Sequence, residues 1–381
     1  MNGRLWGRGL LVAMLASGLL LSGCGQERPP RTVIIPDTPA SSGTEPVNED
    51  FAVRKIYTFP EPGAAGGPLL GWADSNQLLG LYGRYPDRSL DRVDYRLGSQ
   101  QPIMKLGASL EGAELSPDGR FVVYVKAEDA VRKVMLLDWS TQQETFIQEV
   151  PRDRQVATAL AWSGNGQYLG YGLEGRIQNE SRLILYDMAG KSLQDYPIPA
   201  WASRDMSYGL QIADNGQSAL LVKSEGRQSK LVYGQLTGEA FVSQYELPAS
   251  AGTAFGYLHD DQILFASAEG ALLSFDRRNR VTSTLLERVG TFRLSPDRKY
   301  IAYTKGQDEI FVAKLQGNAI LNEKSIYKGL IPFQIDWSPD DKKILLSGRK
   351  PYSREEPGPV SSGPATAAQS SIPFIIEFSH S

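Results

Sequence analysis

The chain has 381 residues, of which 40 are Lys or Arg and 43 are Asp or Glu, and its formal net charge is −3. Because acidic and basic residues nearly balance, the chain lacks the excess positive charge that binds nucleic acid, and we expect no nucleic-acid partner. The only cysteine is Cys24. A disulfide within the chain is therefore excluded, and an exported domain of this length must rely on its hydrophobic core.

The first 24 residues have the order of features found in an export signal. Arg4 and Arg8 precede an uncharged stretch, 9–23, which is too short to span a membrane as a helix. This stretch ends in Leu21-Ser22-Gly23-Cys24 and resembles a bacterial lipoprotein signal peptide. The resemblance implies removal of residues 1–23 and acylation of Cys24, for example with palmitate. It also implies a cell-membrane location facing outside the cytoplasm. The alternative is an ordinary cleavable signal with an incidental cysteine.

Residues 24–51 are predicted to form a flexible tether. Five prolines fall within this segment, and they keep a chain extended and unpacked. The tether would hold the rest of the protein away from the lipid surface.

A strand is predicted over Val53–Phe59, and a short unit then recurs along the chain. The unit joins an apolar anchor residue to a polar turn and a second strand, as in Leu115-Ser116-Pro117-Asp118-Gly119 followed by Phe121–Val125. Seven copies are recognisable at intervals of 36 to 50 residues, and their anchors are Trp72, Leu115, Trp162, Ile212, Leu258, Leu294 and Trp337. Self-similarity with such a period indicates one supersecondary unit copied many times.

Two further strands follow most copies, so each copy has the four strands of a propeller blade. The predicted fold is an all-β propeller over residues 52–381, with seven four-stranded blades. The last copy has only three strands, so we expect Val53–Phe59 to complete that blade and close the ring. Six or eight blades are the alternatives.

A second biased segment, 351–371, interrupts the last blade. Its Pro, Gly, Ser and Ala content predicts a mobile insertion. Such a loop could cover a channel mouth or bind a partner, or it could be an insertion without a function.

The residues that recur in the turns have structural explanations. Asp and Asn side chains stabilise turns by accepting hydrogen bonds from the backbone two residues on, and this explanation is favoured over a calcium site for Asp118, Asn165, Asn215, Asp297 and Asp340. The anchor tryptophans Trp72, Trp162 and Trp337 are expected to pack between blades. Trp139 and Trp201 fall outside the repeat register, and they are the better candidates for surface recognition.

Residues that carry chemistry are scarce. The chain has two histidines, His259 on a predicted turn and His380 near the end, so a zinc site of His and Cys ligands is not expected. Neither a serine-hydrolase elbow nor a phosphate-binding or dinucleotide-binding glycine loop is present. We therefore predict no catalytic, cofactor-binding or metal-binding residue, and Cys24 is the only predicted functional site.

The repeat carries a family resemblance. Leu115–Tyr124 and Leu294–Tyr303 resemble the repeat of TolB-like and related WD-type bacterial propellers. The resemblance implies the propeller fold and, as in TolB-like proteins, a role in protein interaction. The chain differs from the TolB-like pattern in its lipoprotein signal, its short tether and its seven copies.

These features together predict a lipid-anchored extracytoplasmic propeller that acts as a non-enzymatic protein-interaction or envelope-binding module. Its expected partners are the membrane, through Cys24, and a protein of the cell envelope. The alternative is a small-molecule or glycan sensor or hydrolase with its site at the channel mouth. Inward-facing paired acids and aromatics would favour the alternative, whereas an apolar patch on one face of the ring would favour a protein partner.

Overall fold

The computed structural model describes most of the region predicted to be the propeller. The predicted signal peptide, Cys24 and most of the predicted tether lie outside the described residues, as does the predicted insertion beyond Pro351. The backbone alone is described for 32–33 and 206–208. The described residues are 32–33, 50–59, 68–83, 87–106, 110–128, 131–175, 180–199, 201, 206–225, 228–249, 252–351 and 373–379.

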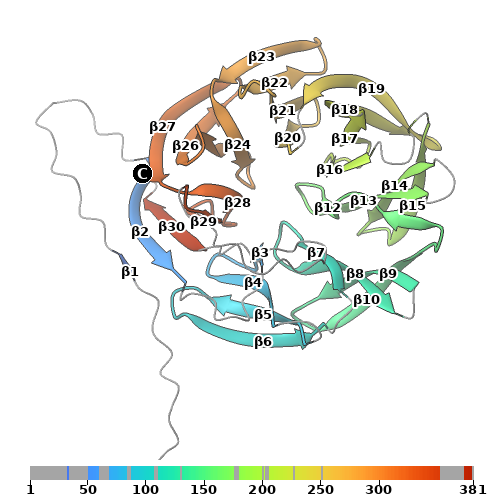
Figure 1. Cartoon of the computed structure of the whole chain (residues 1–381), viewed down its shortest axis with the longest axis horizontal. Helices are drawn as coiled ribbons and strands as arrows, with labels where there is room; N and C mark the ends of the chain where they lie inside the picture. The colour runs from blue at the N-terminus through green and yellow to red at the C-terminus, as the bar shows by residue number, and fades with distance from the viewer. Residues whose placement is uncertain are drawn as a thin grey trace, which may run out of the picture.

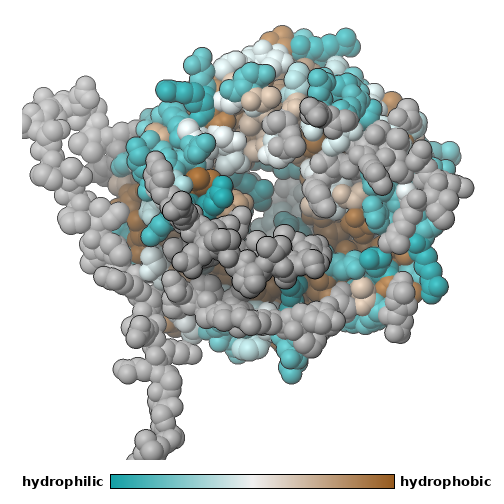
Figure 2. Space-filling view, in the orientation of Figure 1, coloured by the Kyte–Doolittle hydropathy of each residue, from teal (hydrophilic) through white to brown (hydrophobic). Residues whose placement is uncertain are grey.

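The fold is a β-propeller of seven four-stranded antiparallel blades, as predicted (Figure 1). The elements are all strands in the described part of the chain, and none of its segments forms a helix long and apolar enough to cross a membrane. Figure 2 shows a hollow at the centre of the ring.

The blades follow one another in chain order, each running from an innermost to an outermost strand. In blade 3, β11 and β12 both pair with β13 and form two segments of the innermost strand. Blade 1 comprises β3 (Leu69–Trp72), β4 (Gln77–Tyr82), β5 (Ser89–Asp94) and β6 (Ser99–Lys105). Blade 2 comprises β7 (Leu110–Leu115), β8 (Phe121–Glu128), β9 (Val131–Asp138) and β10 (Gln143–Val150). Blade 3 comprises β11 (Arg154–Val156), β12 (Ala161–Trp162), β13 (Tyr168–Gly175), β14 (Ser181–Asp187) and β15 (Ser192–Ile198).

Blades 4 to 6 repeat this arrangement, and blade 7 combines both ends of the described chain. Blade 4 comprises β16 (Met206–Ile212), β17 (Ser218–Glu225), β18 (Gln228–Thr237) and β19 (Ala240–Ala249), and blade 5 comprises β20 (Phe255–His259), β21 (Gln262–Ala266), β22 (Leu272–Asp276) and β23 (Val281–Leu286). Blade 6 comprises β24 (Val289–Leu294), β25 (Tyr300–Lys305), β26 (Glu309–Gln316) and β27 (Ala319–Lys328). Blade 7 comprises β28 (Ile331–Trp337), β29 (Lys343–Arg349), β30 (Phe374–Ser379) and β2 (Ala52–Thr58).

The ring is closed by the N-terminal strand, which confirms the prediction made for Val53–Phe59. β2 pairs with β30 in an antiparallel register that places Ile56 opposite Ile376, so it forms the outermost strand of the four in blade 7. β1 (Thr32–Val33) pairs with the free edge of β2. Chain segments more than 300 residues apart therefore share one sheet.

The core is divided among the blade interfaces. The second strand of each blade is covered on both faces by neighbouring blades, so it is an uninterrupted apolar run instead of an alternating one; β21, for example, is buried throughout. Buried residues form seven hydrophobic clusters, and each cluster joins two adjacent blades. Because every blade contributes to two clusters, the blades stabilise one another around the ring.

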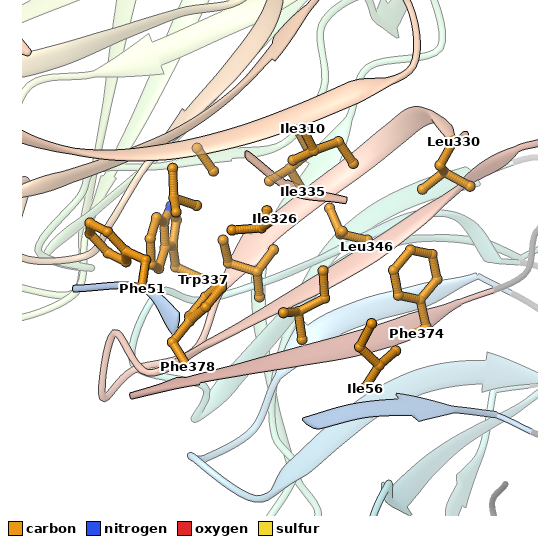
Figure 3. Packing of buried hydrophobic residues seen from close by; sticks show 14 residues of the cluster. Phe51, Ile56, Ile310, Ile326, Leu330, Ile335, Trp337, Leu346, Phe374 and Phe378 are labelled. Atoms are coloured by element: carbon orange, nitrogen blue, oxygen red, sulfur yellow. The ribbon is translucent and has the colours of Figure 1, made fainter. Parts of the chain in front are cut away.

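The residues immediately before β2 pack into one of these clusters (Figure 3). The Phe51 side chain is fully buried, and its ring meets those of Tyr300 and Phe378 edge to face at centroid distances of 5.4 and 6.0 Å. The Asp50 carboxylate lies 2.6 Å from the Lys314 ammonium of blade 6. The end of the predicted tether is thus part of the interface between blades 6 and 7.

The repeat register predicted for blade 5 is wrong by one residue. Tyr257 pairs with Ile263 as Leu294 pairs with Ile301, so Tyr257 and not Leu258 is the anchor. Blade 5 joins its first two strands through the two-residue turn Asp260-Asp261, which lacks the Ser-Pro-Asp sequence that marks the register in blades 2, 6 and 7.

Candidate functional site

The candidate site is the central channel. The innermost strands of all seven blades line it, and the hollow to which it belongs, which also extends along blade 1 as far as Gln100, has a volume of about 2230 Å³. This is larger than the roughly 300–1,000 Å³ of most small-molecule pockets, so the channel can accept a ligand together with water or part of a larger molecule.

In every blade, the residue immediately before the anchor, which is the apolar residue that begins the repeated unit, lines the channel. The anchor side chain itself turns toward the preceding blade: the Trp72 indole nitrogen donates to the Asp336 carbonyl at 3.1 Å, and that of Trp337 donates to the Arg293 carbonyl at 3.2 Å. Because side chains alternate along a strand, the residue before the anchor points the other way. These seven channel residues are Gly71, Glu114, Ala161, Gln211, Gly256, Arg293 and Asp336.

The charged channel residues come from one side of the ring. Arg293 and Asp336 belong to adjacent blades 6 and 7, and a guanidinium nitrogen of Arg293 lies 3.7 Å from the Asp336 carboxylate. Glu114 stands on blade 2, separated from Asp336 only by blade 1, which has Gly71 at this level. Blades 3, 4 and 5 have Ala161, Gln211 and Gly256 there, so the opposite side is uncharged.

Asp336 is held in place by its own blade. Gln334, two residues earlier on β28, donates to the Asp336 carboxylate at 2.7 Å and to the Leu69 carbonyl of blade 1 at 3.1 Å. The Gln334 side-chain oxygen in turn accepts from the Ser347 hydroxyl at 3.1 Å. The carboxylate of Asp336 is therefore oriented before any ligand arrives.

Glu114 has a different environment. Its side chain is exposed to the channel, and the partial loss of hydration that the channel walls impose raises its pKa to about 7. The positive charge of Arg293 opposes the rise in pKa, and the negative charge of Asp336 adds to it. No hydrogen bond or ion pair to the Glu114 carboxylate is found within the part of the chain that the structure describes.

Arg298 spans the channel at the side where the repeated turns lie. It belongs to blade 6, yet its guanidinium lies 2.6 Å from the Asp214 carboxylate of blade 4 and beside Gly164 of blade 3, where an added side chain would collide with it. Asp214 also accepts from the backbone nitrogen of Asn165 at 3.0 Å. This bridge between three blades narrows the turn side of the channel.

The turn acids have the structural role that was predicted. The Asp118 carboxylate accepts from the backbone nitrogen of Arg120 at 3.1 Å, and Asn165, Asn215, Asp297 and Asp340 make the equivalent bond two residues on. Among the described residues, no group of three or more His, Cys, Asp or Glu side chains is placed to hold a metal ion.

The remaining predicted residues fall into three groups. Cys24 and His380 lie outside the described residues, and His259 is exposed on its turn, where its Nδ1 atom accepts from the Asp261 nitrogen at 3.3 Å. The three anchor tryptophans pack between blades as predicted. The prediction of surface recognition is wrong for Trp201 and stays a prediction for Trp139, which is half-buried. Trp201 is buried against Phe241, and Trp139 donates to the Gly119 carbonyl at 2.7 Å.

Sequence reasoning missed the charged channel residues. The position before the anchor holds seven residues of no common chemical type, so no motif marks it. The signal that could have identified these residues is their place in the repeat, directly before the anchor residue of each copy.

No family model and no curated protein matches the chain. Among solved structures, it resembles an oligogalacturonate lyase in complex with manganese (TM-score 0.59, 12% identity, 92% of this chain and 98% of the other) and an oligogalacturonate lyase from Vibrio parahaemolyticus (0.60, 11%, 91% and 96%). It also resembles the propeller domain of the trilobed protease from Pyrococcus furiosus (0.52, 11%, 75% and 92%). At these identities the likeness shows the β-propeller fold alone.

Proposed function

We propose that this protein is an extracytoplasmic binding module, anchored to a membrane through acyl chains on Cys24, which holds a component of the cell envelope in its central channel. The observation that carries the proposal is the channel itself. It is large, and Glu114, Arg293 and Asp336 lie on one side of it at the level just before the anchors, so a ligand would be both enclosed and oriented.

The outer surface gives less support for a ligand site. Six large hydrophobic side chains are exposed on the outer parts of blades 1 to 6, one on each: Leu97, Phe146, Leu193, Val242, Val281 and Leu321. A seventh, Phe333 of blade 7, is exposed to the channel instead. Singly scattered apolar residues are normal on a protein surface and do not mark an interface. We therefore propose the channel, and not the rim, as the site of the partner.

Gly112 allows a direct test. It lines the channel on β7, and a Cβ atom added there would meet no atom of a neighbouring residue within 4 Å, so there is open space next to it. Gly112→Tyr should fill the channel without disturbing its wall, and Gly112→Ala is the matched control. Envelope components captured by the lipidated wild-type protein and by Gly112→Ala should be lost from Gly112→Tyr. Equal capture by all three proteins would refute binding in the channel.

The attachment is tested separately. Cys24→Ser should move the protein from the membrane fraction to the soluble extracytoplasmic fraction, because a chain without acyl groups keeps no strong membrane contact. A Cys24→Ser protein that still sediments with membranes would contradict the lipid anchor without bearing on the channel.

A second function is favoured by one observation. Glu114 and Asp336 are two acids that line the channel in different environments, and glycosidic-bond hydrolysis uses two carboxyl groups whose environments differ. The likeness to oligogalacturonate lyases makes acidic oligosaccharides a reasonable first panel. Release of new reducing ends or unsaturated products by the wild type, but not by Glu114→Gln, would replace the binding function with this one.

A further inference from the structure

The outermost strand of blade 7 differs in burial from the outermost strands of the other six blades. Each of those strands has three to six exposed residues, whereas β2 has one, Arg54. The Ile56 and Tyr57 side chains are only 7% and 6% exposed, and they pack against blade 6 and blade 1 respectively. Neighbouring blades therefore cover both faces of β2 at these two residues.

The outer edge of β2 at the same two residues is where β1 lies (Figure 1). An edge strand presents N–H and C=O groups that must be paired or hydrated. Apolar side chains on both faces restrict the access of water to this edge, so a further strand is its favourable partner. The register sets Thr32 opposite Tyr57 and Val33 opposite Ile56. In the described part of the chain, no other blade has a strand beyond its outermost one.

The sequence of the tether, residues 24–51, supports this pairing. Thr32-Val33-Ile34-Ile35 is its only run of four β-branched residues, and the run lies between Pro30 and Pro36. β-Branched residues favour strands, and proline cannot donate to a ladder. The tether therefore contains one short segment suited to pair with an edge, and this segment includes β1.

We propose that the outer edge of β2 is a strand-docking site, that β1 of the same chain is its occupant, and that this docking sets the reach of the tether. Thr32 is eight residues from Cys24, and Asp50 is 26 residues from it. Eight residues span at most about 30 Å, and 26 span at most about 90 Å. Docked β1 thus keeps the ring close to the lipid that holds Cys24, and release of β1 lets the ring move further away. The docking is independent of the channel, and only the reach rests on the proposed anchor.

Hydrogen–deuterium exchange of the full-length protein, measured by mass spectrometry, tests the docking. The double-proline variant, Thr32→Pro with Val33→Pro, lacks the β1 amide donors and cannot form the pairing. Amides of β2 should then exchange about tenfold faster at its outer edge, while those paired with β30 are unchanged. Ser41→Pro with Ser42→Pro adds two prolines elsewhere in the tether and should leave exchange in β2 unchanged. Slow exchange in β21, which is buried throughout, shows that the ring of each variant is folded.

Two results would overturn the docking. One is equal exchange of β2 in the wild type and the double-proline variant. The other is protection of β2 that falls when the wild-type protein is diluted, because a second copy would then supply the paired strand. The dilution series needs no variant.

Energy transfer tests the reach. The lipidated protein carries a donor dye on Ser99→Cys, at the exposed start of β6, in phosphatidylcholine and phosphatidylglycerol vesicles that contain acceptor lipids. Transfer should be stronger with the wild-type tether than with the double-proline tether, and equal transfer would refute the effect on reach. A Cys24→Ser protein that stays on membranes would overturn the anchor but leave the exchange result standing, so the two failures are distinguishable.

Discussion

The last residue of the repeated turn adopts a left-handed backbone in five blades. Three of these positions are glycine, which takes positive φ without strain, but blades 6 and 7 have Arg298 and Asp341. A residue with a side chain costs about 1–2 kcal/mol in this conformation. At Arg298 the strained position holds the guanidinium that crosses the channel. The φ values are 73° at Gly119, 70° at Gly166, 67° at Gly216, 61° at Arg298 and 55° at Asp341.

Substitutions at Arg298 should separate strain from pairing. Arg298→Ala and Arg298→Gly both lose the ion pair with Asp214, but only the glycine variant loses the strain. Arg298→Gly should therefore be about 1 kcal/mol more stable than Arg298→Ala in chemical denaturation. At the neighbouring Lys299, whose φ is not positive, the order should reverse, with Ala more stable than Gly by roughly 0.5–1 kcal/mol.

Glu114 should make stability depend on pH. Its pKa is raised to about 7 in the folded protein from its ordinary value of 4.5, so the folded state binds the Glu114 proton more tightly than the unfolded state. This stabilising contribution is complete below pH 4.5 and is lost as the pH rises through 7. Glu114→Gln, which mimics the protonated acid, should raise the Tm relative to wild type by about 2 °C or more at pH 8.

At pH 5 the Tm values of Glu114→Gln and the wild type should be nearly equal. A Tm difference that is the same at both pH values would show that Glu114 ionises normally in the folded protein.

At the scale of the element, the serine of the repeated turn explains why the motif recurs. The Ser338 hydroxyl accepts from the backbone nitrogen of Lys343 at 2.9 Å and donates to the Asp340 carboxylate at 2.6 Å. Ser116, Ser163 and Ser295 make the same pair of bonds in their blades. The serine thus binds both the start of the second strand and the acid that shapes the turn.

Removing this hydroxyl should therefore be costly. Ser338 is fully buried, so Ser338→Ala leaves the Lys343 nitrogen without a side-chain acceptor and should destabilise the protein by about 1–3 kcal/mol in urea unfolding. Ser99→Ala, on the exposed start of β6, should change the stability by less than about 0.5 kcal/mol. Equal effects of the two substitutions would contradict the role assigned to the turn serine.

The same motif decided how much of the structure the sequence could predict. Where Ser-Pro-Asp or its variants are present, the strand that follows and its register were recognisable, because the bonds that define the turn are local. In blade 5 this signal is missing, and the anchor was displaced from Tyr257 to Leu258. The contacts of Glu114, Arg293 and Asp336 are between blades, and no local pattern encodes which residues meet across a channel. Trp201 was misjudged for the same reason, since the Phe241 ring that covers it lies 40 residues later.

At the scale of the whole molecule, ring closure is the feature with the largest effect on stability. β2 contributes Ile56 and Tyr57 to two different blade interfaces, and Phe51 precedes it in the cluster between blades 6 and 7. Each large buried side chain is worth about 2–5 kcal/mol. The three together are therefore comparable to the total stability of a typical domain.

A chain beginning at Pro68 should lose cooperative thermal unfolding or unfold at a much lower temperature than one beginning at Asp50, as measured by circular dichroism. Addition of a peptide of residues 50–59 should restore part of the loss. A Pro68 chain that melts like the longer one would show that blade 7 is stable with three strands.

The docking of Asp50 and Phe51 also has a mechanical meaning. A force pulling on the N-terminal segment meets this docking point before it reaches the hydrogen bonds between β2 and β30. To advance further, the force has to extract the Phe51 ring from between Tyr300 and Phe378 and separate Asp50 from Lys314. Since these partners come from two blades, the load is divided between two sheets. The entry of the chain into the ring therefore serves as a clamp. Under the proposed attachment through Cys24, shear at the anchoring surface would not directly peel the closing strand.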